Sequence, residues 1–383
     1  MNYDFIVLGG TGTQGRIVSK DLLLHGYSVL LCGRDQKRVE KILAQFKKAR
    51  FQYLDLNDLP TAKQIIKNAN SDVLVNCAEG DWNVEVAEIC GKLGLNCIDL
   101  GSEIWLTRKQ LAFNEAYKKN SAIHITGCGS VPGVGNVMLA HAADKFDTLQ
   151  NVECGFAWNS NIKKFVVPYS ILSIIEEFTF PAMNVKNGKL IREVALENIK
   201  EWNDEFVGEQ QALYVQHAEP YTFHRYFKHK GLKNVRFYAE FPPHSFNTIK
   251  LLMDLGLGSK EPVKVNGALV RPVDVLTEVL KDLKPPQGYK EMENLWVSVT
   301  GKKGGKNKTI KMQCLVKTLT GWEDAGSNVD TGMPASIMAQ MIKNKIITKT
   351  GCFAPEAIVP PAPFFAELRK RQMTVYENGK LIN

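Results

Sequence analysis

A glycine-rich segment near the start of the chain limits the possible folds more than any other feature. It is Gly10-Thr11-Gly12-Thr13-Gln14-Gly15, which matches the pattern Gly-x-Gly-x-x-Gly. The apolar run of residues 5–8 comes directly before it, and a helical pattern with Ile17, Val18 and Leu22 on one face follows it. A strand, a glycine turn and a helix in this order are typical of dinucleotide-binding domains, in which the helix start binds the pyrophosphate. A purely structural turn is the alternative.

The first third of the chain alternates strand-like and helix-like segments. Six short apolar runs predict strands, at residues 5–8, 29–32, 52–54, 73–76, 97–99 and 123–126. Strands that alternate with helices form parallel sheets, and the right-handed crossover rule leaves few other topologies. After about residue 150 the strand-like runs are longer, and residues 296–300 and 309–318 predict an antiparallel hairpin. The predicted fold class is therefore α/β, with a Rossmann doubly wound parallel sheet and a second α+β substrate domain.

The end of the second predicted strand bears on the choice between NAD and NADP. An NAD site usually has Asp or Glu at this point, to bind the ribose hydroxyls of the adenosine. This chain has Cys32-Gly33-Arg34-Asp35 instead. Gly33 leaves room, and the guanidinium of Arg34 suits a 2′-phosphate, whereas Asp35 is one position late and better placed as a helix N-cap. The segment favours NADP over NAD, with a solvated surface role for Arg34 as the alternative.

Further cofactor contacts are expected after the third and fourth predicted strands. Ligands of open parallel sheets bind beyond the carboxyl ends of the strands. The fourth strand ends in Asn76-Cys77-Ala78-Glu79, which we expect beside the nicotinamide. Asp55 follows the third strand and is a candidate contact of the adenine. Because Asp and Asn are also common in loops, an ordinary loop role stays open for each.

The composition argues against several classes of protein. Hydrophobic residues make up 44% of the 383 residues, enough to exclude a mostly disordered chain. The net charge of +8 is spread out, and its densest cluster, residues 302–308, is predicted to be a solvated hairpin tip, so no nucleic-acid partner is expected. No apolar run of about 18 residues and no basic leader occur, which predicts a cytoplasmic protein without membrane partners. The eight cysteines include no Cys-x-x-Cys pair, so neither a metal site nor disulfides are expected.

Segments along nearly the whole chain resemble one known family. They are residues 96–103 (Asn-Cys-Ile-Asp-Leu-Gly-Ser-Glu), 127–136 (Gly-Cys-Gly-Ser-Val-Pro-Gly-Val-Gly-Asn), 331–337 (Thr-Gly-Met-Pro-Ala-Ser-Ile), and Pro355-Glu356 with Pro363-Phe364. These segments resemble the saccharopine dehydrogenase family. The resemblance implies NAD(P)-dependent oxidation or formation of a C–N bond of an amino acid.

The resemblance also implies how the chain is divided. We expect a dinucleotide-binding Rossmann domain over residues 1–130 and an α+β substrate and dimerisation domain over residues 131–330. A C-terminal helical segment, residues 331–383, is expected to return to the Rossmann domain. Its first helix is predicted over residues 334–344, starting at Pro334 with Asp330 or Thr331 as its cap.

The middle of the chain adds details of the resemblance. Tyr169-Ser170 and Glu176-Glu177-Phe178 are similar to the lysine 6-dehydrogenase branch, which suggests Tyr169 as a substrate contact, with simple packing as the alternative. Saccharopine reductases have Asp directly before the Pro-Gly turn, where this chain has Val131. Their Cys-Gly resembles Cys154-Gly155, which makes Cys154 a candidate catalytic residue, with a buried strand thiol as the alternative.

A polar cluster in the second domain can supply catalytic groups. It is His217-Ala218-Glu219-Pro220-Tyr221-Thr222-Phe223-His224-Arg225. His217 can transfer a proton near neutral pH, and Glu219 can orient it or pair with a substrate ammonium. Arg225 can bind a substrate carboxylate in a bidentate pair. A polar loop capped by Thr222 would look similar.

The function predicted from these features is an enzyme. We expect an NAD(P)-dependent oxidoreductase that acts on the CH–NH or CH–NH₂ group of an amino-acid substrate and forms a homodimer. The alternative is a non-catalytic NADP-binding sensor or regulator of the short-chain type. The long second domain with its own polar cluster argues against a sensor, which needs no substrate cavity.

Overall fold

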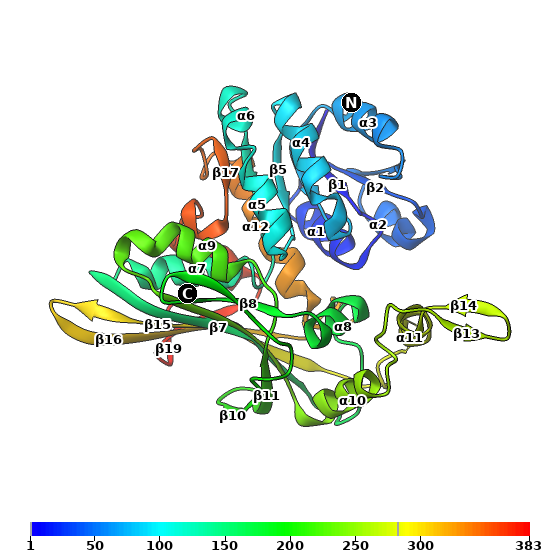
Figure 1. Ribbon diagram of the computed structural model, residues 1–383. Coiled ribbons are helices and arrows are strands. Elements are labelled where there is room, and N and C mark those ends of the chain that lie inside the picture. Colours follow the sequence, from blue (N-terminus) through cyan, green and yellow to red (C-terminus); the bar gives the residue numbers. More distant parts are fainter. Residues whose placement is uncertain (1, 282) are drawn as a thin grey trace.

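The computed structural model describes residues 2–281 and 283–383 and contains two large sheets (Figure 1). The first sheet has seven parallel strands in the order β17-β6-β5-β4-β1-β2-β3. Their bounds are β1 Tyr3–Leu8, β2 Val29–Gly33, β3 Ala49–Tyr53, β4 Ser71–Asn76, β5 Asn96–Asp99, β6 Ile123–Ile125 and β17 Gly351–Phe353. This is the doubly wound parallel sheet expected from the sequence, because six of its strands come from the alternating first third of the chain.

Both faces of the first sheet are buried because successive side chains of a strand point to opposite faces. Val7 and Val75 pack with α1 on one face, whereas Ile6 and Leu74 pack with α3 and α4 on the other. The helices of this domain are α1 Thr13–Leu24, α2 Glu40–Gln45, α3 Leu59–Ala69, α4 Asn83–Leu93, α5 Ile104–Leu111 and α6 Asn114–Lys119, with short 3₁₀ turns η1 Gln36–Val39 and η2 Gly80–Trp82. Because the seven strands are parallel, their carboxyl ends all lie at the same end of the sheet, outside the buried core.

The second sheet is mixed and has the strand order β10-β11-β12-β7-β15-β16-β18-β19, with β8 and β9 joined at β12. Its strands are β7 Thr148–Ser160, β8 Ala182–Lys186, β9 Lys189–Glu193, β10 Lys200–Asp204, β11 Gly208–Tyr214, β12 Asn234–Phe241, β15 Glu291–Lys303, β16 Lys306–Lys317, β18 Thr374–Glu377 and β19 Lys380–Leu381. The long hairpin β15–β16 confirms the expected antiparallel pair and the exposed tip at residues 302–307.

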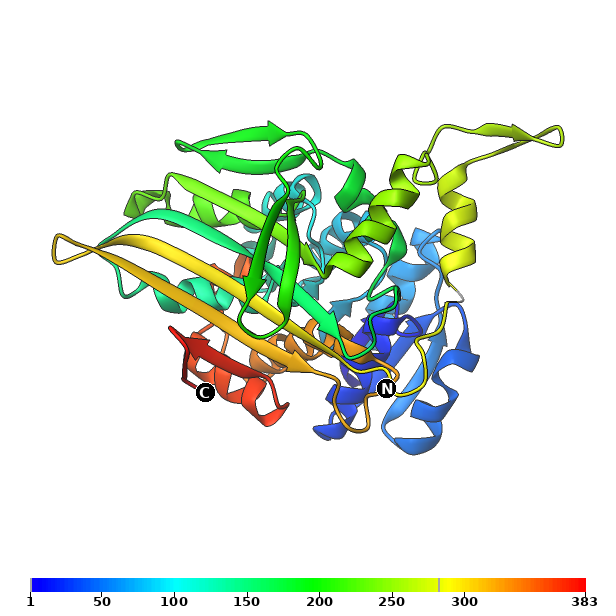
Figure 2. The same cartoon turned by 90° about the horizontal axis from the view of Figure 1, so that it is seen from below.

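Helices on the second sheet lie between it and the first domain (Figure 1). They are α7 Val134–Ala143, α8 Ile171–Thr179 and α9 Glu219–Phe227. Figure 2 shows the opposite face of the sheet, and it also shows a projection made of α10 Pro243–Asp254, the hairpin β13 Val263–Val265 with β14 Ala268–Val270, and α11 Pro272–Lys281. No helix in residues 2–281 or 283–383 is long and apolar enough to cross a membrane.

The C-terminal segment contacts both sheets. Helix α12 (Val329–Lys343) packs along α1, which agrees with its expected place on the nucleotide-binding domain, and β17 pairs with β6. After helix α13 (Pro361–Lys370), however, β18 pairs with β16 and extends the second sheet. The expected start of α12 was wrong, since the helix begins at Val329 without a side-chain cap and contains Pro334. A proline this close to a helix start removes few backbone hydrogen bonds. The three-part division by residue number stays a prediction.

Candidate active site

The glycine-rich loop forms a cradle for an anion at the start of α1. The N–H of Gly12 donates to the carbonyl of Gly9 at 2.8 Å, and the N–H of Gly10 donates to Cys32 at the end of β2. Helix α1 begins at Thr13 and has no side-chain cap, so its first N–H groups are available to a ligand. A Cβ atom at Gly15 would lie 2.2 Å from the carbonyl oxygen of Gly9, so only glycine fits. These features fit a dinucleotide pyrophosphate.

The end of β2 is shaped by contact with the same loop. A Cβ atom at Gly33 would lie 2.5 Å from Oγ1 of Thr11, so this position also requires glycine. Arg34 is exposed beside it. Asp35 accepts a hydrogen bond from the N–H of Lys37 at 3.0 Å and caps η1, which confirms its predicted N-cap role. Because Asp35 is engaged in this cap, Arg34 is the polar side chain at the position where an NAD site has Asp or Glu.

Two further guanidinium groups lie on this side of the loop. Arg16 follows Gly15 on α1, and Arg38 belongs to η1. Burial and the positive charge of Arg38 lower the pKa of Arg16, while Asp324 opposes this effect. Two like charges held near each other suit a doubly charged anion such as a 2′-phosphate. Arg16 was not among the residues predicted from the sequence, although it comes directly after the third glycine of the loop.

The residues expected near the nicotinamide lie at the carboxyl end of β4. Asn76 is buried, donates to Oδ1 of Asn83 at 2.8 Å and accepts from the N–H of Ala78 at 3.2 Å. Cys77 is half-buried, and burial raises the pKa of its thiol. Glu79 is exposed. These residues share the edge of the sheet with the glycine loop, since Cys77 donates its N–H to Leu8 of β1 at 2.9 Å.

Asp55 and Gln14, two of the predicted cofactor contacts, both make hydrogen bonds to other side chains of the protein. The carboxylate of Asp55 accepts from the N–H and the side chain of Asn57 at 3.0 and 2.9 Å, so it shapes its own turn beyond β3. The side-chain amide of Gln14 donates to Oδ1 of Asn328 at 3.2 Å. The glycine loop is thereby joined to the segment that leads into α12.

His217 and Glu219 form a buried pair in the second domain. Nδ1 of His217 lies 3.0 Å from Oε2 of Glu219, and the imidazole stacks on Phe237 with 3.9 Å between ring centres. Glu219 is fully buried in the first turn of α9, where the helix dipole stabilises a carboxylate. Its Oε1 has no hydrogen-bond partner within residues 2–281 and 283–383. The loop alternative was wrong, because residues 219–227 are helical and Thr222 lies inside the helix.

A second carboxylate, on the half-buried Glu177, lies near enough to this pair to interact with the charge of His217. The hydroxyl of Tyr169 donates to Oε2 of Glu177 at 2.5 Å. Burial raises the pKa of Glu177 to about 7, while the bond from Tyr169 and the charge of His217 oppose the increase. Tyr169, predicted as a substrate contact, is thus hydrogen-bonded to a group that interacts with His217.

A further buried carboxylate is that of Glu356, on the short 3₁₀ turn Pro355–Ala357 that follows β17. The amide of Asn136 donates to Oε2 of Glu356 at 2.7 Å, and Oδ1 of Asn136 accepts from the N–H of Gly133 at 2.8 Å. Burial raises the pKa of Glu356 to about 7, and the charge of Glu219 adds to the increase. The Pro-Gly-x-x-Asn turn and the Pro-Glu segment of the sequence therefore meet at this site.

Two of the predicted site residues do not fit their roles. Cys154 is fully buried, its thiol lies 3.6 Å from the carbonyl of Arg236, and burial together with the charge of Glu219 raises its pKa well above the usual range. The thiol therefore stays protonated and packs as a small hydrophobe. Arg225 is exposed on α9 and donates to the hydroxyl of Tyr221 at 3.2 Å, so the structure does not bring it together with His217.

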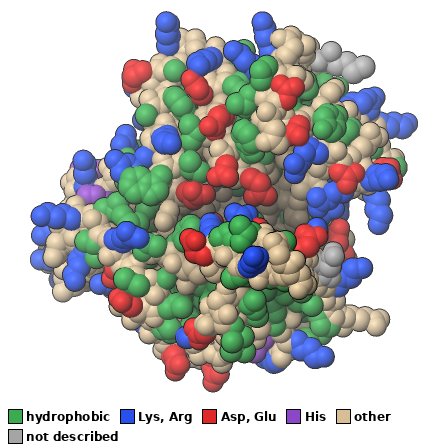
Figure 3. Space-filling model, turned by 45° about the vertical axis from the view of Figure 1, so that its right-hand side comes forward, with side chains coloured by type: hydrophobic (Ala, Val, Ile, Leu, Met, Phe, Trp, Pro, Cys, Tyr) green, Lys and Arg blue, Asp and Glu red, His purple; other side chains and the backbone are tan. Residues whose placement is uncertain are grey.

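Acidic side chains also gather at the surface near the site. Figure 3 shows Asp and Glu side chains across the middle of one face, beside a hollow. Burial and the charges of Glu176 on α8 and Asp81 on η2 raise the pKa of Glu103, so carboxylates of both domains lie near one another here. The described residues contain no group of three or more His, Cys, Asp or Glu side chains arranged to hold a metal ion. Carboxylates gathered in this way are suited to bind a positively charged organic group.

A Rossmann domain whose cofactor edge lies against a second domain with a buried His–Glu pair defines a two-domain, dinucleotide-dependent oxidoreductase. Two family models match the chain, the saccharopine dehydrogenase NADP binding domain over residues 5–125 and the saccharopine dehydrogenase C-terminal domain over residues 129–373. The chain belongs to the saccharopine dehydrogenase family, as the resemblance of its segments indicated.

Individual relatives agree with this assignment. Carboxynorspermidine synthase of Vibrio cholerae is 23% identical over 92% of this chain and 90% of its own length. Carboxyaminopropylagmatine dehydrogenase of Synechocystis is 22% identical over 97% of both chains. The solved structure of apo saccharopine dehydrogenase (L-Glu forming) from Saccharomyces cerevisiae covers 100% of both chains with a TM-score of 0.76 and 12% identity, which confirms the predicted fold class. The prediction of an NAD(P)-dependent oxidoreductase is confirmed, and a non-catalytic sensor is not favoured.

Proposed function

We propose that this protein is an NADP-dependent oxidoreductase that forms or cleaves the C–N bond of an amine that carries a carboxylate and at least one positive charge. The observation that supports this most directly is the unpartnered Oε1 of the fully buried Glu219, beside His217. An unsatisfied carboxylate oxygen at this depth is costly unless a ligand donates to it. A substrate ammonium is the group that would do so.

The names of the relatives support the same class of substrate. They are a carboxynorspermidine synthase and a carboxyaminopropylagmatine dehydrogenase, both named for carboxylated amines. The carboxylates of the buried Glu219 and Glu356 and of the half-buried Glu177 would offset the charge of such an amine. A carboxylated polyamine is therefore the proposed substrate class. This is more specific than the amino-acid substrate that was predicted from the sequence.

His217 is the proposed proton carrier. When bound, the nicotinamide would accept or supply the hydride at the carbon that bears nitrogen. In the oxidative direction His217 would take the proton released from the substrate nitrogen, and water would hydrolyse the resulting imine. Glu219 would hold the imidazole through Nδ1, which leaves Nε2 for the substrate. Glu177 and its partner Tyr169 would bind the charged end of the substrate.

NADP is the proposed cofactor because of the three guanidinium groups near the ribose position. Arg34 stands where an NAD site has an acid, and Arg16 lies close enough to Arg38 for their charges to interact. The matching model of an NADP binding domain supports this choice. A homodimer and a cytoplasmic location stay predictions.

The test of the proposed function is a panel of substrates with both cofactors. Purified protein would be mixed with NADP or NAD and a series of carboxylated polyamines, amino acids and amines without a carboxylate. The reverse reaction would combine NADPH with amine and aldehyde pairs. We expect turnover with a carboxylated polyamine and NADP. Turnover confined to uncharged alcohols or aldehydes would contradict the proposal.

A further inference from the structure

The carboxylate of Asp99, at the end of β5, is buried in the first domain and has no part in the proposed reaction. Its Oδ1 accepts hydrogen bonds from the N–H groups of Gly101 at 2.8 Å and Gly127 at 3.2 Å, and it lies 3.2 Å from the hydroxyl of Thr126. Its Oδ2 accepts from the side-chain amide of Gln110 on α5 at 2.6 Å. One carboxylate therefore joins the loops that follow β5 and β6 to helix α5.

His124 of β6 supplies the charge that balances Asp99. Nδ1 of His124 lies 3.1 Å from the carbonyl of Cys97 and carries a proton, because a carbonyl can only accept. Nε2 lies 3.5 Å from Oδ2 of Asp99 and 3.3 Å from Nε2 of Gln110. The amide of Gln110 already donates to Asp99 at 2.6 Å and to the carbonyl of Asn83 at 3.3 Å. An unprotonated Nε2 would face the carboxylate without a donor, so we assign His124 as an imidazolium.

The surroundings of His124 agree with this assignment. Burial lowers the pKa of its imidazole, but the contacts with Cys97 and the charge of Asp99 outweigh burial and raise the pKa above its ordinary value. The ring stacks on Tyr117 with 5.4 Å between ring centres, and the hydroxyl of Tyr117 donates to the carbonyl of Ala87 on α4 at 2.8 Å. A buried ion pair is strongly destabilised when one partner is removed, so this pair keeps the network in one arrangement.

The network extends to the loop after β4 and to the glycine-rich loop. Asn83, which accepts from Gln110 at its carbonyl, also accepts at Oδ1 from the side chain of Asn76 at 2.8 Å. Asn76 in turn accepts from the N–H of Ala78 at 3.2 Å. A Cβ atom at Gly9 would lie 2.6 Å from the backbone nitrogen of Ala78, so the two loops are in direct contact. The residues expected beside the nicotinamide are therefore connected to Asp99.

The same network also reaches the second domain. Arg108 of α5 lies 5.5 Å from the ring centre of Tyr221 on α9, the helix that begins at Glu219. A Cβ atom at Gly127 would lie 2.7 Å from Pro132, so the loop after β6 packs on the turn that leads into α7. Figure 1 shows α5 at the edge of the first domain that faces α7 and α9. Helix α5 and these loops thus lie where the two domains meet.

We propose that Asp99, charge-balanced by His124, is a positioning residue whose carboxylate holds the loops after β4, β5 and β6 in the arrangement in which the nicotinamide meets the substrate carbon. This inference rests on the proposed use of a nicotinamide cofactor, but it does not require His217 to be the proton carrier. The defect it predicts is specific. The cofactor would still bind through the glycine-rich loop and Arg34, whereas hydride transfer would become slow, because reacting atoms must be aligned closely.

Asp99→Asn is the test, since it keeps the shape of the side chain and replaces one acceptor oxygen by a donor. We expect kcat to fall at least about tenfold, while the dissociation constant for NADPH and the KM for the amine change by less than about twofold. The primary isotope effect on kcat with NADPH deuterated at C4 should rise, because hydride transfer becomes the slow step. Thr126→Val removes a single donor beside Asp99, so it should give the same pattern at smaller size even if Asp99→Asn does not fold.

Tyr117→Phe is the matched control, because it removes a buried hydrogen bond behind His124 that leads to α4. It should lower the stability without changing kcat or the isotope effect. Nicotinamide fluorescence at saturating NADPH separates this inference from the proposed function, since it needs no turnover. It should be weaker in both site variants than in the wild type and in the control. Unchanged fluorescence and isotope effect in both site variants would overturn the proposal, and so would a loss of NADPH affinity as large as the loss of kcat.

Discussion

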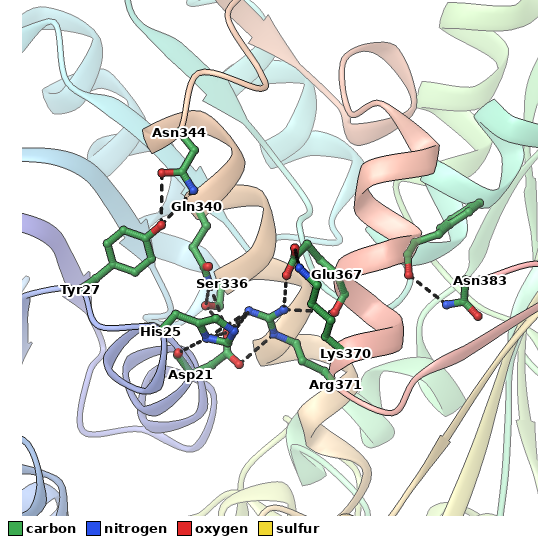
Figure 4. Close-up of polar contacts among 11 residues, drawn as sticks. Asp21, His25, Tyr27, Ser336, Gln340, Asn344, Glu367, Lys370, Arg371 and Asn383 are labelled. Atoms are coloured by element: carbon green, nitrogen blue, oxygen red, sulfur yellow. Dashed lines mark hydrogen bonds and ion pairs between the residues drawn. The ribbon is translucent and has the colours of Figure 1, made fainter.

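The guanidinium of Arg371 binds the carboxylate of Asp21 with two hydrogen bonds, from Nε to Oδ1 at 2.9 Å and from Nη2 to Oδ2 at 2.8 Å (Figure 4). Both residues are buried. Ser336 of α12 donates to the same carboxylate at 2.6 Å, and Glu367 of α13 accepts from Nη1 of Arg371 at 2.9 Å. The helix that starts at the cofactor loop is thus held at its other end by the C-terminal segment.

Replacing Arg371 alone should destabilise the protein strongly. Arg371→Met leaves Asp21 as an uncompensated buried charge, which costs about 3–5 kcal/mol of the free energy of unfolding. Urea denaturation at neutral pH measures this cost. The double variant Asp21→Asn with Arg371→Met should recover part of the lost stability, because the buried charge is then absent. An unchanged midpoint in the single variant would show that the ion pair does not hold α1.

Arg34→Ala should weaken binding of NADPH much more than binding of NADH. A charge-assisted hydrogen bond to the 2′-phosphate is worth about 1.5–3 kcal/mol, so the dissociation constant for NADPH should rise at least about tenfold. Arg16→Ala should act in the same direction. Fluorescence titration with each cofactor gives the constants. Arg50→Ala is the control, since this arginine donates to the carbonyls of Lys47 and Ala49 at the start of β3. Equal losses for both cofactors would contradict the assignment of the phosphate site.

His217→Ala should lower turnover by about a hundredfold or more while leaving cofactor affinity unchanged, because a positioned acid or base contributes at least this factor. Glu219→Gln should mainly raise KM for the amine, since it removes the negative charge that the substrate ammonium would meet. Steady-state kinetics separate the two effects. The control is His224→Ala, which changes a half-buried histidine of α9, the helix that also carries Glu219. Near-normal kinetics in both site variants would rule out the pair as the acid–base group.

The stability of the free protein should fall between about pH 5 and pH 8. Burial raises the pKa of Glu177 and of Glu356 from 4.5 to about 7 in the folded state. A carboxyl with a raised folded pKa contributes stability that is fully present below its unfolded pKa and is lost as the pH rises through the folded pKa. Each group can remove at most about 1.4 kcal/mol per pH unit in this window.

Glu177→Gln should remove one of these titrations. The variant should gain stability over the wild type near pH 8 and little near pH 5, because the amide stays neutral at both values. Chemical denaturation at the two pH values measures the difference. A variant that is equally destabilised at both would indicate that Glu177 is ionised and satisfied in the folded protein.

The glycine loop, the parallel sheet and the cap at Asp35 could be predicted from the sequence because each depends on neighbouring residues. Periodicity and turn chemistry are local, and so are the strand that precedes Gly10 and the helix that follows it. The contact between His217 and Glu219 could also be anticipated, since only Ala218 lies between them in the sequence.

The rest of the site depends on contacts between distant segments. Glu356 meets Asn136 across 220 positions, and Glu177 approaches His217 from α8. The burial of Cys154 and the outward direction of Arg225 follow from the strand and helix that carry them, which the polar pattern of residues 217–225 did not reveal. The segments quoted for the family resemblance contained Glu356 and Asn136, but their sequence alone did not show that they meet.

The most direct test of the central claim is transfer of deuterium from NADPH labelled at C4 of the nicotinamide into the product. The protein would be incubated with the labelled cofactor, an amine and a carboxyl-bearing aldehyde, and the product would be analysed by mass spectrometry. The proposed reaction predicts a secondary amine with deuterium on the former aldehyde carbon, which is the carbon bonded to nitrogen in the new C–N bond. A product without deuterium on that carbon, or a labelled alcohol formed from the aldehyde alone, would contradict it.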